Sequence, residues 1–358
     1  MDAREPTKAT GRLFQIQRAL LPTMSGNDPK LLHTSSQLST IIDQDTPEDV
    51  EYPLSKAEVF SFLENVLAMS KPNELLERDR HEFLARFTLL MNTKIPFSNL
   101  HIISTPNLVT FRLPTLQECK EALLQGYGGN CFYINMFTKA LLDLLGFKTF
   151  HVGANNPGDT LFDSHVSTIV CDLSHPGSQH LVDPGTIRPL FEAIPLDFEK
   201  ESPVYQFNYV KVKFFKRDHG ILLSCSQVPE PKKASRNIFE DEGCFWKIEL
   251  IYRLHVPRSR AHWLDRIKYV YNFPSLDPRI HEVVCIFGFI GDRCAALCSD
   301  GKLFAMKLEH SDPSDVEVRF LSREEFVALV QKEFPQYPLR MIENAIANIK
   351  YSHNMNKY

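Results

Sequence analysis

The chain has 358 residues, long enough for roughly two or three domains with sizeable cores. Its 40 Lys and Arg residues are balanced by 44 Asp and Glu residues, which excludes the basic excess of a nucleic-acid-binding surface. No apolar stretch approaches the length that spans a bilayer, and the first residues lack the apolar core of a signal peptide, so we expect a cytoplasmic protein without membrane segments.

The cysteines are scattered, and no CxxC pair occurs. Because zinc sites need paired ligands at short spacing, we expect reduced thiols, mostly buried, and no metal site. The eight residues are Cys119, Cys131, Cys171, Cys225, Cys244, Cys285, Cys294 and Cys298.

Residues 1–52 are polar and broken by Pro, Ser, Thr and Asp clusters, which predicts a disordered N-terminal tail. A mitochondrial pre-sequence is the alternative, but Asp2 and Glu5 disfavour it because such segments are poor in acidic residues.

A helical block is predicted over residues 53–146. Ser55 to Glu58 forms a capping box ahead of a first helix. Asn73 begins a second helix, with apolar residues through Leu90, which the segment Ile95 to Leu100 ends. A third helix opens with the capping box Thr115 to Glu118 and stops at Gly126.

The next segment, Gly128-Gly129-Asn130-Cys131, has the features of a turn that positions a nucleophile at a helix N-terminus. Two glycines permit a tight turn, and Asn130 is a good N-cap for the apolar helix that ends at Gly146. A thiol at a helix N-terminus sits at the positive end of the helix dipole, where the reactive thiolate is stabilised. Cys131 is therefore the candidate nucleophile.

From residue 147 to 242 the apolar period changes to two, which predicts strands at 147–152, 165–172, 180–183, 209–215 and 220–224. Residues 229–243 are expected to be a polar linker. The last part, 243–358, alternates strands with helices at 261–271, 326–334 and 339–349, the second of these behind a capping box at 322–325.

A cysteine nucleophile needs an imidazole to share its proton and an acid to hold that imidazole. His165 opens an apolar strand, where a solvated histidine is not expected, and Asp183 ends the next one. In one hairpin register the two stand opposite each other on one face. His180 is the rival base, but at three residues from Asp183 on the same strand it points to the opposite face.

Together these motifs resemble the arylamine N-acetyltransferase family. Ile95 to Leu100 is similar to its I/V-P-F-E-N-L segment, Gly128 to Asn135 to its R-G-G-x-C-x-x-x-N signature, and Val182 to Gly185 to its V-D-x-G segment. Ala140 to Phe147 resembles its A-L-x-x-L-G-F helix end, and the likeness is strongest between residues 95 and 190.

The resemblance implies an α+β fold with a papain-like, transglutaminase-type core. Its parts would be a helical bundle with Cys131 (53–146), a β-barrel with His165 and Asp183 (147–242), and an α/β lid with a C-terminal helix (243–358). It also implies ping-pong transfer of acetyl from acetyl-CoA, through a thioester on Cys131, to an aromatic amine or hydrazine, as in xenobiotic metabolism. His165 would shuttle the proton, and Asp183 would fix the His165 tautomer.

The sequence departs from the family pattern at three positions. Tyr127 replaces the arginine before the glycine pair, and Thr186 and Ile187 replace the aromatic residue and the glycine of D-x-G-F-G. Loss of the arginine at Tyr127 is expected to loosen the turn or remove a structural ion pair. Loss of the aromatic residue at Thr186 is expected to reshape the acceptor or acyl pocket, and Ile187 in place of glycine to obstruct close approach of the cofactor. The three proposed catalytic residues are retained, so the changes concern specificity more than chemistry. Two alternatives stay open: hydrolysis or a longer acyl-CoA on the same three residues, and a non-catalytic scaffold. The sequence leaves the acceptor, the CoA contacts and the oligomeric state undetermined.

Overall fold

A computed structural model describes residues 51–104, 113–159, 163–187, 190–207, 210–231, 235–272, 283–291, 293–309 and 316–355. The predicted tail thus lies outside the described residues, apart from Glu51 and Tyr52. Tyr52 is buried, with its ring centroid 6.2 Å from that of Phe137, so the folded body begins slightly before the predicted boundary at residue 53.

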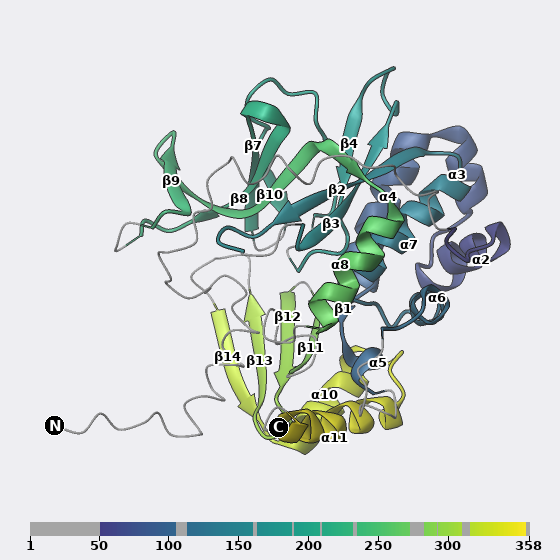
Figure 1. Cartoon of the computed structure of the whole chain (residues 1–358), viewed down its shortest axis with the longest axis vertical. Coiled ribbons are helices and arrows are strands. Elements are labelled where there is room, and N and C mark those ends of the chain that lie inside the picture. The colour runs from purple at the N-terminus through teal and green to yellow at the C-terminus, as the bar shows by residue number, and fades with distance from the viewer. Residues whose placement is uncertain are drawn as a thin grey trace.

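Helices of the N-terminal part form the right-hand side of the molecule in Figure 1. They are α2 (Lys56–Ser61) with the π-helical turn η2 (Phe62–Val66), α3 (Pro72–Arg78), α4 (Arg80–Lys94), α5 (Leu100–Ile103), α6 (Leu116–Leu124) and α7 (Cys131–Leu144).

The capping boxes predicted at Ser55 and Thr115 are present, each with the reciprocal hydrogen bonds of the motif. The prediction of one continuous helix from Asn73 was wrong, although its predicted end at Ile95 matches the C-cap of α4. Asp79 has extended backbone (φ −154°, ψ 100°) and caps α4 by accepting a hydrogen bond from the Glu82 N–H at 3.0 Å, so the segment divides into α3 and α4.

A nine-stranded antiparallel sheet follows, seen curled at the top of Figure 1. Its main path runs β5-β4-β3-β2-β10-β8-β7-β6, and β9 pairs with β10. The strands are β2 (Lys148–Asn155), β3 (His165–Cys171), β4 (Gln179–Val182), β5 (Ile194–Pro195), β6 (Tyr205–Phe207), β7 (Val210–Arg217), β8 (Ile221–Val228), β9 (Ile238–Asp241) and β10 (Cys244–Arg258), with the 3-10 turn η3 (Asp218–Gly220) between β7 and β8.

Strand β10 lies in the middle of this sheet, between β2 and β8. The division predicted at residue 242 assigned it to the lid, because β10 is separated from its partner β2 by almost a hundred residues and sequence alone shows no such pairing. The predicted linker 229–243 also contains a strand: β9 forms a hairpin with β10, turning at Glu242, whose φ is +50°. The other domain boundaries stay predictions.

A second, smaller sheet has the order β1-β11-β12-β13-β14 and lies at the bottom of Figure 1. Its strands are β1 (Phe97–Ser98), β11 (Val284–Ile290), β12 (Arg293–Ser299), β13 (Phe304–Glu309) and β14 (Val316–Leu321); the remaining helices are α8 (Arg260–Asn272), α10 (Arg323–Glu333) and α11 (Leu339–Met355). β14 was not predicted, although its residues alternate. The short strand β1 comes from the N-terminal part and ties it to this sheet.

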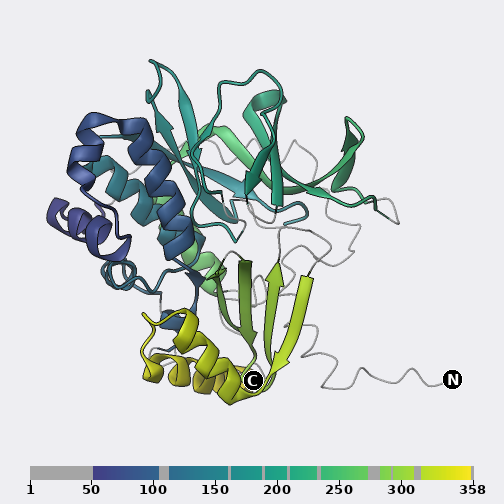
Figure 2. The same cartoon turned by 180° about the vertical axis from the view of Figure 1, so that it is seen from behind.

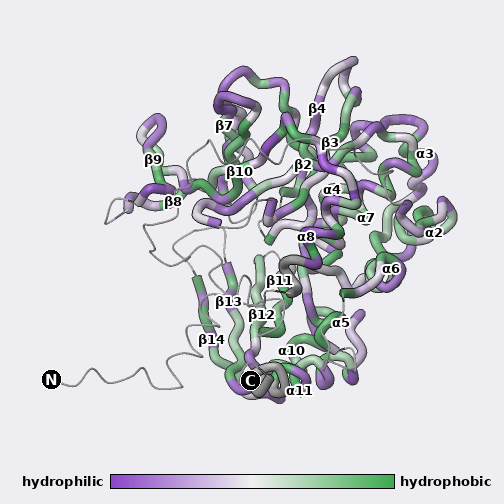
Figure 3. Tube along the Cα trace, viewed as in Figure 1, coloured by the Kyte–Doolittle hydropathy of each residue, from purple (hydrophilic) through white to green (hydrophobic). Residues whose placement is uncertain are grey.

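Helix α7 packs on β2 and β3 and carries the largest share of apolar residues at the junction of helices and sheet. Helices α10 and α11 cover one face of the small sheet, as the view from behind shows (Figure 2). Strands β11 and β12 are predominantly hydrophobic (Figure 3), which fits their place inside that sheet. Among the described helices, none has the length and apolar character of a membrane span.

Candidate active site

The turn before α7 depends on its glycines. Gly128 has φ +70°, and a Cβ there would overlap the carbonyl oxygen of Pro96. The Ser98 N–H donates to the Gly129 carbonyl at 2.9 Å, so the segment carrying Pro96 lies directly against the turn. The two motifs that stand far apart in the sequence, Ile95 to Leu100 and the glycine pair, thus form one structural unit.

Cys131 is the first residue of α7 and is partly exposed. The N-cap Asn130 accepts a hydrogen bond from the Tyr133 N–H at 3.2 Å, which fixes the start of the helix. The sulfur therefore sits at the positive end of a fourteen-residue helix. All eight cysteines fall within the described residues and all are free thiols.

His165, the first residue of β3, and Asp183, the residue after β4, contact each other directly. The imidazole Nε2 lies 2.8 Å from Asp183 Oδ2, and both side chains are buried. Burial alone would lower the pKa of His165, but the charge and hydrogen bond of Asp183, together with a hydrogen bond to the Cys131 sulfur, outweigh it and raise that pKa to about 10. The direction of this shift favours the imidazolium form of the ring beside the cysteine.

The register of β3 and β4 differs from the predicted one by two residues. Thr168 pairs with Val182, so continuing the register places Ser167, not His165, across from Asp183. His165 reaches the carboxylate diagonally. Because side chains alternate with period two along a strand, a shift of two leaves both on the same face, and the pairing of histidine with aspartate survives the error.

Asp183 is fully buried and accepts hydrogen bonds from three side chains besides His165. The Ser167 hydroxyl donates to Oδ2 at 2.8 Å, the Tyr252 hydroxyl to Oδ2 at 3.0 Å, and the Asn135 amide to Oδ1 at 2.9 Å. Burial and the neighbouring Asp183 charge raise the pKa of Tyr252 well above its usual value, so the phenol stays protonated and donates. These donors hold a buried charge that would otherwise be costly.

Sequence reasoning missed the roles of these three donors. Asn135 belongs to the signature motif and lies one helical turn from Cys131, but the sequence did not predict its hydrogen bond to Asp183. It also donates to the Val166 carbonyl at 2.6 Å, which joins α7 to β3. Tyr252 comes from β10, sixty-nine residues after Asp183, and no local pattern indicates that contact.

Gly185 brings the segment after Asp183 against the nucleophile. A Cβ at this position would overlap the Asn135 amide nitrogen and lie 3.0 Å from the Cys131 carbonyl oxygen. The glycine of V-D-x-G is therefore required by close packing, independent of its backbone angles.

The rival base His180 lies elsewhere. Its Nε2 is 3.3 Å from the Ser174 hydroxyl, and its ring faces His81 at 5.9 Å between centroids. The altered residue Tyr127 packs on Tyr337, with ring centroids 5.8 Å apart, and its carbonyl accepts a hydrogen bond from the Tyr337 hydroxyl at 2.8 Å. An aromatic contact and a backbone hydrogen bond thus hold the turn where the family pattern has an arginine.

Ile187, the other changed position beside Thr186, packs against the apolar cluster of the small sheet that includes Cys285 and Phe287. Within the described residues, no group of histidine, cysteine and carboxylate side chains is arranged to hold a metal ion.

A family model described as N-acetyltransferase matches residues 82–336, which is more than half of the chain. The chain therefore belongs to the arylamine N-acetyltransferase family. The membership supports an acyltransferase, as the sequence motifs indicated. No protein with a curated description matches the sequence.

Solved structures similar to this chain include arylamine N-acetyltransferases from three bacteria. That of Nocardia farcinica has 17% identity and a TM-score of 0.61, with 84% of this chain and 98% of that chain covered. That of Mycobacterium abscessus has 14% identity and a TM-score of 0.59, covering 83% and 99%. A Mycobacterium marinum structure in complex with CoA has 15% identity and a TM-score of 0.58, covering 81% and 99%. At these identities the likeness concerns the fold, and it confirms the predicted α+β fold.

Proposed function

We propose that this protein transfers an acetyl group from acetyl-CoA, through a thioester on Cys131, to a small aromatic amine or hydrazine. The observation that carries the proposal is the 2.8 Å contact between the buried His165 and Asp183, with the Cys131 sulfur on the same imidazole at a helix N-terminus. This arrangement favours a thiolate beside an imidazolium, which is an activated nucleophile with a proton donor in contact.

In the first half-reaction the Cys131 sulfur attacks the thioester carbonyl and forms a tetrahedral intermediate. The developing oxyanion would be stabilised by backbone N–H groups at the start of α7, which a helix N-terminus leaves without partners in the helix. When the intermediate collapses, the bond to the CoA sulfur breaks and His165 donates its proton to that sulfur. The products are acetyl-Cys131 and CoA.

In the second half-reaction the neutral His165 accepts a proton from the acceptor amine as its nitrogen attacks acetyl-Cys131. The bond to the Cys131 sulfur breaks, which releases the amide and restores the thiolate–imidazolium pair. Asp183 keeps the ring oriented throughout, because Nε2 is bound to the carboxylate and the other ring nitrogen remains for the sulfur and the substrate.

The family supports a CoA thioester as the donor, since a related M. marinum structure was solved in complex with CoA. We place the acceptor among aromatic amines and hydrazines because the solved relatives are arylamine N-acetyltransferases. The cytoplasm as the place of action stays a prediction from the sequence.

The test is intact-mass measurement after mixing the protein with acetyl-CoA. We expect one acetyl increment, which C131A abolishes and C171A leaves in place, because Cys171 is a partly exposed thiol outside the site. CoA release should then depend on added aromatic amine. An unmodified mass would defeat the proposal.

The two alternatives give other results in the same experiments. CoA release that is equally fast without an amine indicates hydrolysis. A non-catalytic scaffold would show no excess alkylation of Cys131 over Cys171 at pH 6, since no thiolate would be stabilised.

A further inference from the structure

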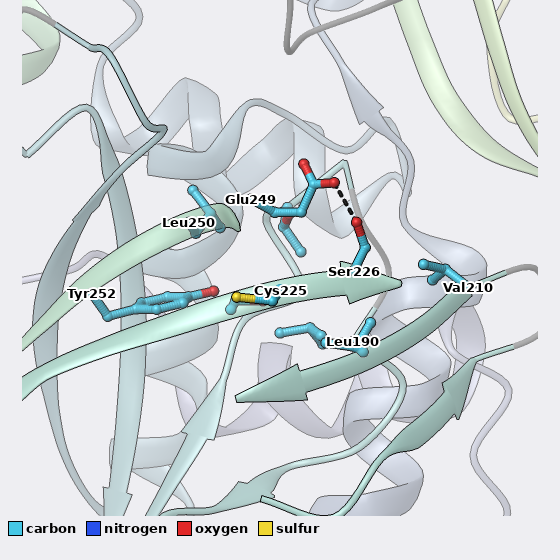
Figure 4. Close-up of a pocket in the computed structure, with 10 residues that line it drawn as sticks. Leu190, Val210, Cys225, Ser226, Glu249, Leu250 and Tyr252 are labelled. Carbon is cyan, nitrogen blue, oxygen red and sulfur yellow. Dashed lines mark hydrogen bonds between the residues drawn. The ribbon is translucent and has the colours of Figure 1, made fainter. Parts of the chain in front are cut away.

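The two sheets differ in how they end. In the large sheet, β7, β8 and β10 surround a hollow between side chains such as Val210 and Leu250, which has room for about one water molecule (Figure 4). The edge strands of that sheet, β5 and β6, have only two and three residues. The small sheet ends at β14, which has six residues and is its outermost strand in Figures 1 and 2. Short edge strands resist pairing with other chains, and β14 lacks this protection.

β14 presents apolar side chains to solvent. Val316, Val318 and Phe320 alternate along the strand and therefore lie on one face of the sheet, with exposed fractions of 42%, 51% and 60%. The strand contains neither proline nor lysine, and its ladder with β13 runs without a bulge, so three common devices that discourage edge pairing are missing from it. An exposed apolar row of this kind marks an interaction surface.

The direction of the backbone groups at this edge follows from the opposite end of the sheet. The Cys285 carbonyl accepts a hydrogen bond from the Asn99 N–H at 3.3 Å, and the Cys285 N–H donates to the Asn99 side-chain oxygen at 2.8 Å. Both backbone groups of Cys285 thus face β1. In an antiparallel sheet the N–H and C=O of one residue point to the same neighbouring strand, so those of Cys285 do not bond to β12.

The regular ladders carry this pattern across to β14. Cys298 lies opposite Cys285 and therefore directs its N–H and C=O to β13, where it exchanges hydrogen bonds with Ala305. Ala305 then has none left for β14, so the N–H and C=O of Phe320, which lies opposite it, point out of the sheet. With a period of two, the same holds for Val318 and Val316. Among the described residues, no strand pairs with this side of β14.

We propose that β14 is a homodimer interface: two copies of the chain pair antiparallel through β14, about a two-fold axis at Val318, and join their small sheets into one. Val318 then lies opposite Val318 of the second copy, and Val316 opposite its Phe320. All the outward-pointing N–H and C=O groups of these residues gain partners, and the apolar rows of the two copies pack side by side on one face. The proposal is independent of the proposed acyltransferase function.

Charge selects this register. With the axis at Val318, Glu317 lies opposite the second copy's Arg319, and the symmetry repeats this pair of opposite charges. Moving the axis by one residue would place Glu317 opposite Glu317, or Arg319 opposite Arg319, both of which are destabilising. Within one copy, Arg319 Nε lies 3.7 Å from Glu317 Oε1 and both side chains are largely exposed, so this contact contributes little and does not compete.

The first test is analytical ultracentrifugation of the full chain over a range of concentrations. We expect a reversible dimer with a Kd on the order of 10 μM, because one strand pair buries less than a standard interface. Val318→Lys places two ammonium groups opposite each other at the axis and should raise the Kd at least about tenfold. Val204→Lys is the matched control: Val204 is 50% exposed and lies outside β14, so the Kd should stay unchanged. Thermal unfolding of each variant verifies the fold.

The second test exchanges the charges. Glu317→Arg and Arg319→Glu should each be monomeric alone, since each brings like charges together across the axis. Mixed, the two variants should form a heterodimer, because every arginine of the first then lies opposite a glutamate of the second. In the wild type, deuterium uptake of the peptide 316–321 should slow as the protein concentration rises, since the amides that point out of the sheet become hydrogen-bonded.

Four results would overturn the proposal. One is a wild type that stays monomeric at about 200 μM, well above the expected Kd. Another is a dimer that Val318→Lys leaves intact, which would place the contact on another surface. A third is a failure of the two charge variants to associate on mixing. The last is a monomer in which the amides of 316–321 already exchange slowly, which would mean that another segment of the same chain covers this edge.

Discussion

Replacement of Asp183 by asparagine removes the charge on which the proposed site depends. The carboxylate is fully buried, and its charge is the first of the causes that raise the pKa of His165 from 6.5 to about 10 against the effect of burial. That difference corresponds to about 5 kcal/mol in favour of the imidazolium, at ~1.4 kcal/mol for each pKa unit. In D183N the ring should be neutral at pH 7.

Two consequences of D183N can be measured. The rate of Cys131 acetylation in rapid-mixing mass measurements should fall roughly a thousandfold, because the thiolate loses its imidazolium partner and the ring its orientation. The stability effect has a defined sign: a raised histidine pKa stabilises the folded state fully below about pH 6.5, and the contribution is lost as the pH rises through about 10. Urea unfolding at pH 6, 8 and 10 should show this loss in the wild type and a much smaller one in D183N.

Asp218→Asn is the matched control, because Asp218 is an exposed aspartate in the turn between β7 and β8. It should change neither the acetylation rate nor the pH dependence. If D183N acetylates Cys131 at the wild-type rate, the charge of Asp183 has no part in activating the sulfur, and the proposed mechanism is refuted.

The remaining predictions concern the residues that hold the site. Tyr252→Phe removes one donor to the buried carboxylate, and amine-dependent CoA release should fall about tenfold; an unchanged rate would show that the other donors suffice. Gly128→Ala should lower the unfolding free energy by about 3 kcal/mol or more, since its Cβ meets backbone, whereas Gly146→Ala, at φ +79° with nothing within 4 Å, should cost only ~1 kcal/mol in the same denaturant titration. Equal losses would contradict the close packing. Tyr337→Phe deletes the hydrogen bond to the Tyr127 carbonyl and should cost ~1 kcal/mol by thermal unfolding while keeping the stacked rings; no change in Tm would mean that the stacking alone holds the turn.

Local signals in the sequence predicted local structure well. The capping boxes at Ser55, Thr115 and Ser322 all begin helices, because the hydrogen bonds of this motif join residues only three positions apart. The turn at the glycine pair and the helix cap at Asn130 were also predicted, because both structures form between residues that are close in the sequence.

Contacts between segments that are far apart in the sequence could not be predicted from local sequence patterns. The hairpin register was off by two residues because turn length, not apolar alternation, decides it, and alternation cannot distinguish shifts of two. The place of β10 beside β2 and the contact of Tyr252 with Asp183 depend on how distant segments assemble. Pairing His165 with Asp183 was possible because both lie at strand ends and because the family resemblance supplied the order of the motifs.

The turn before Cys131 is held by hydrogen bonds from two residues that come about 200 positions later in the sequence. The Gln336 amide and the Tyr337 hydroxyl donate to the carbonyls of Gly126 and Tyr127, each across 210 residues. A nascent polypeptide in which these two donors have not yet been synthesised lacks both hydrogen bonds, even if its helices and large sheet have formed. The turn before Cys131 can therefore be completed only after residues 336 and 337 have been synthesised and have packed against it.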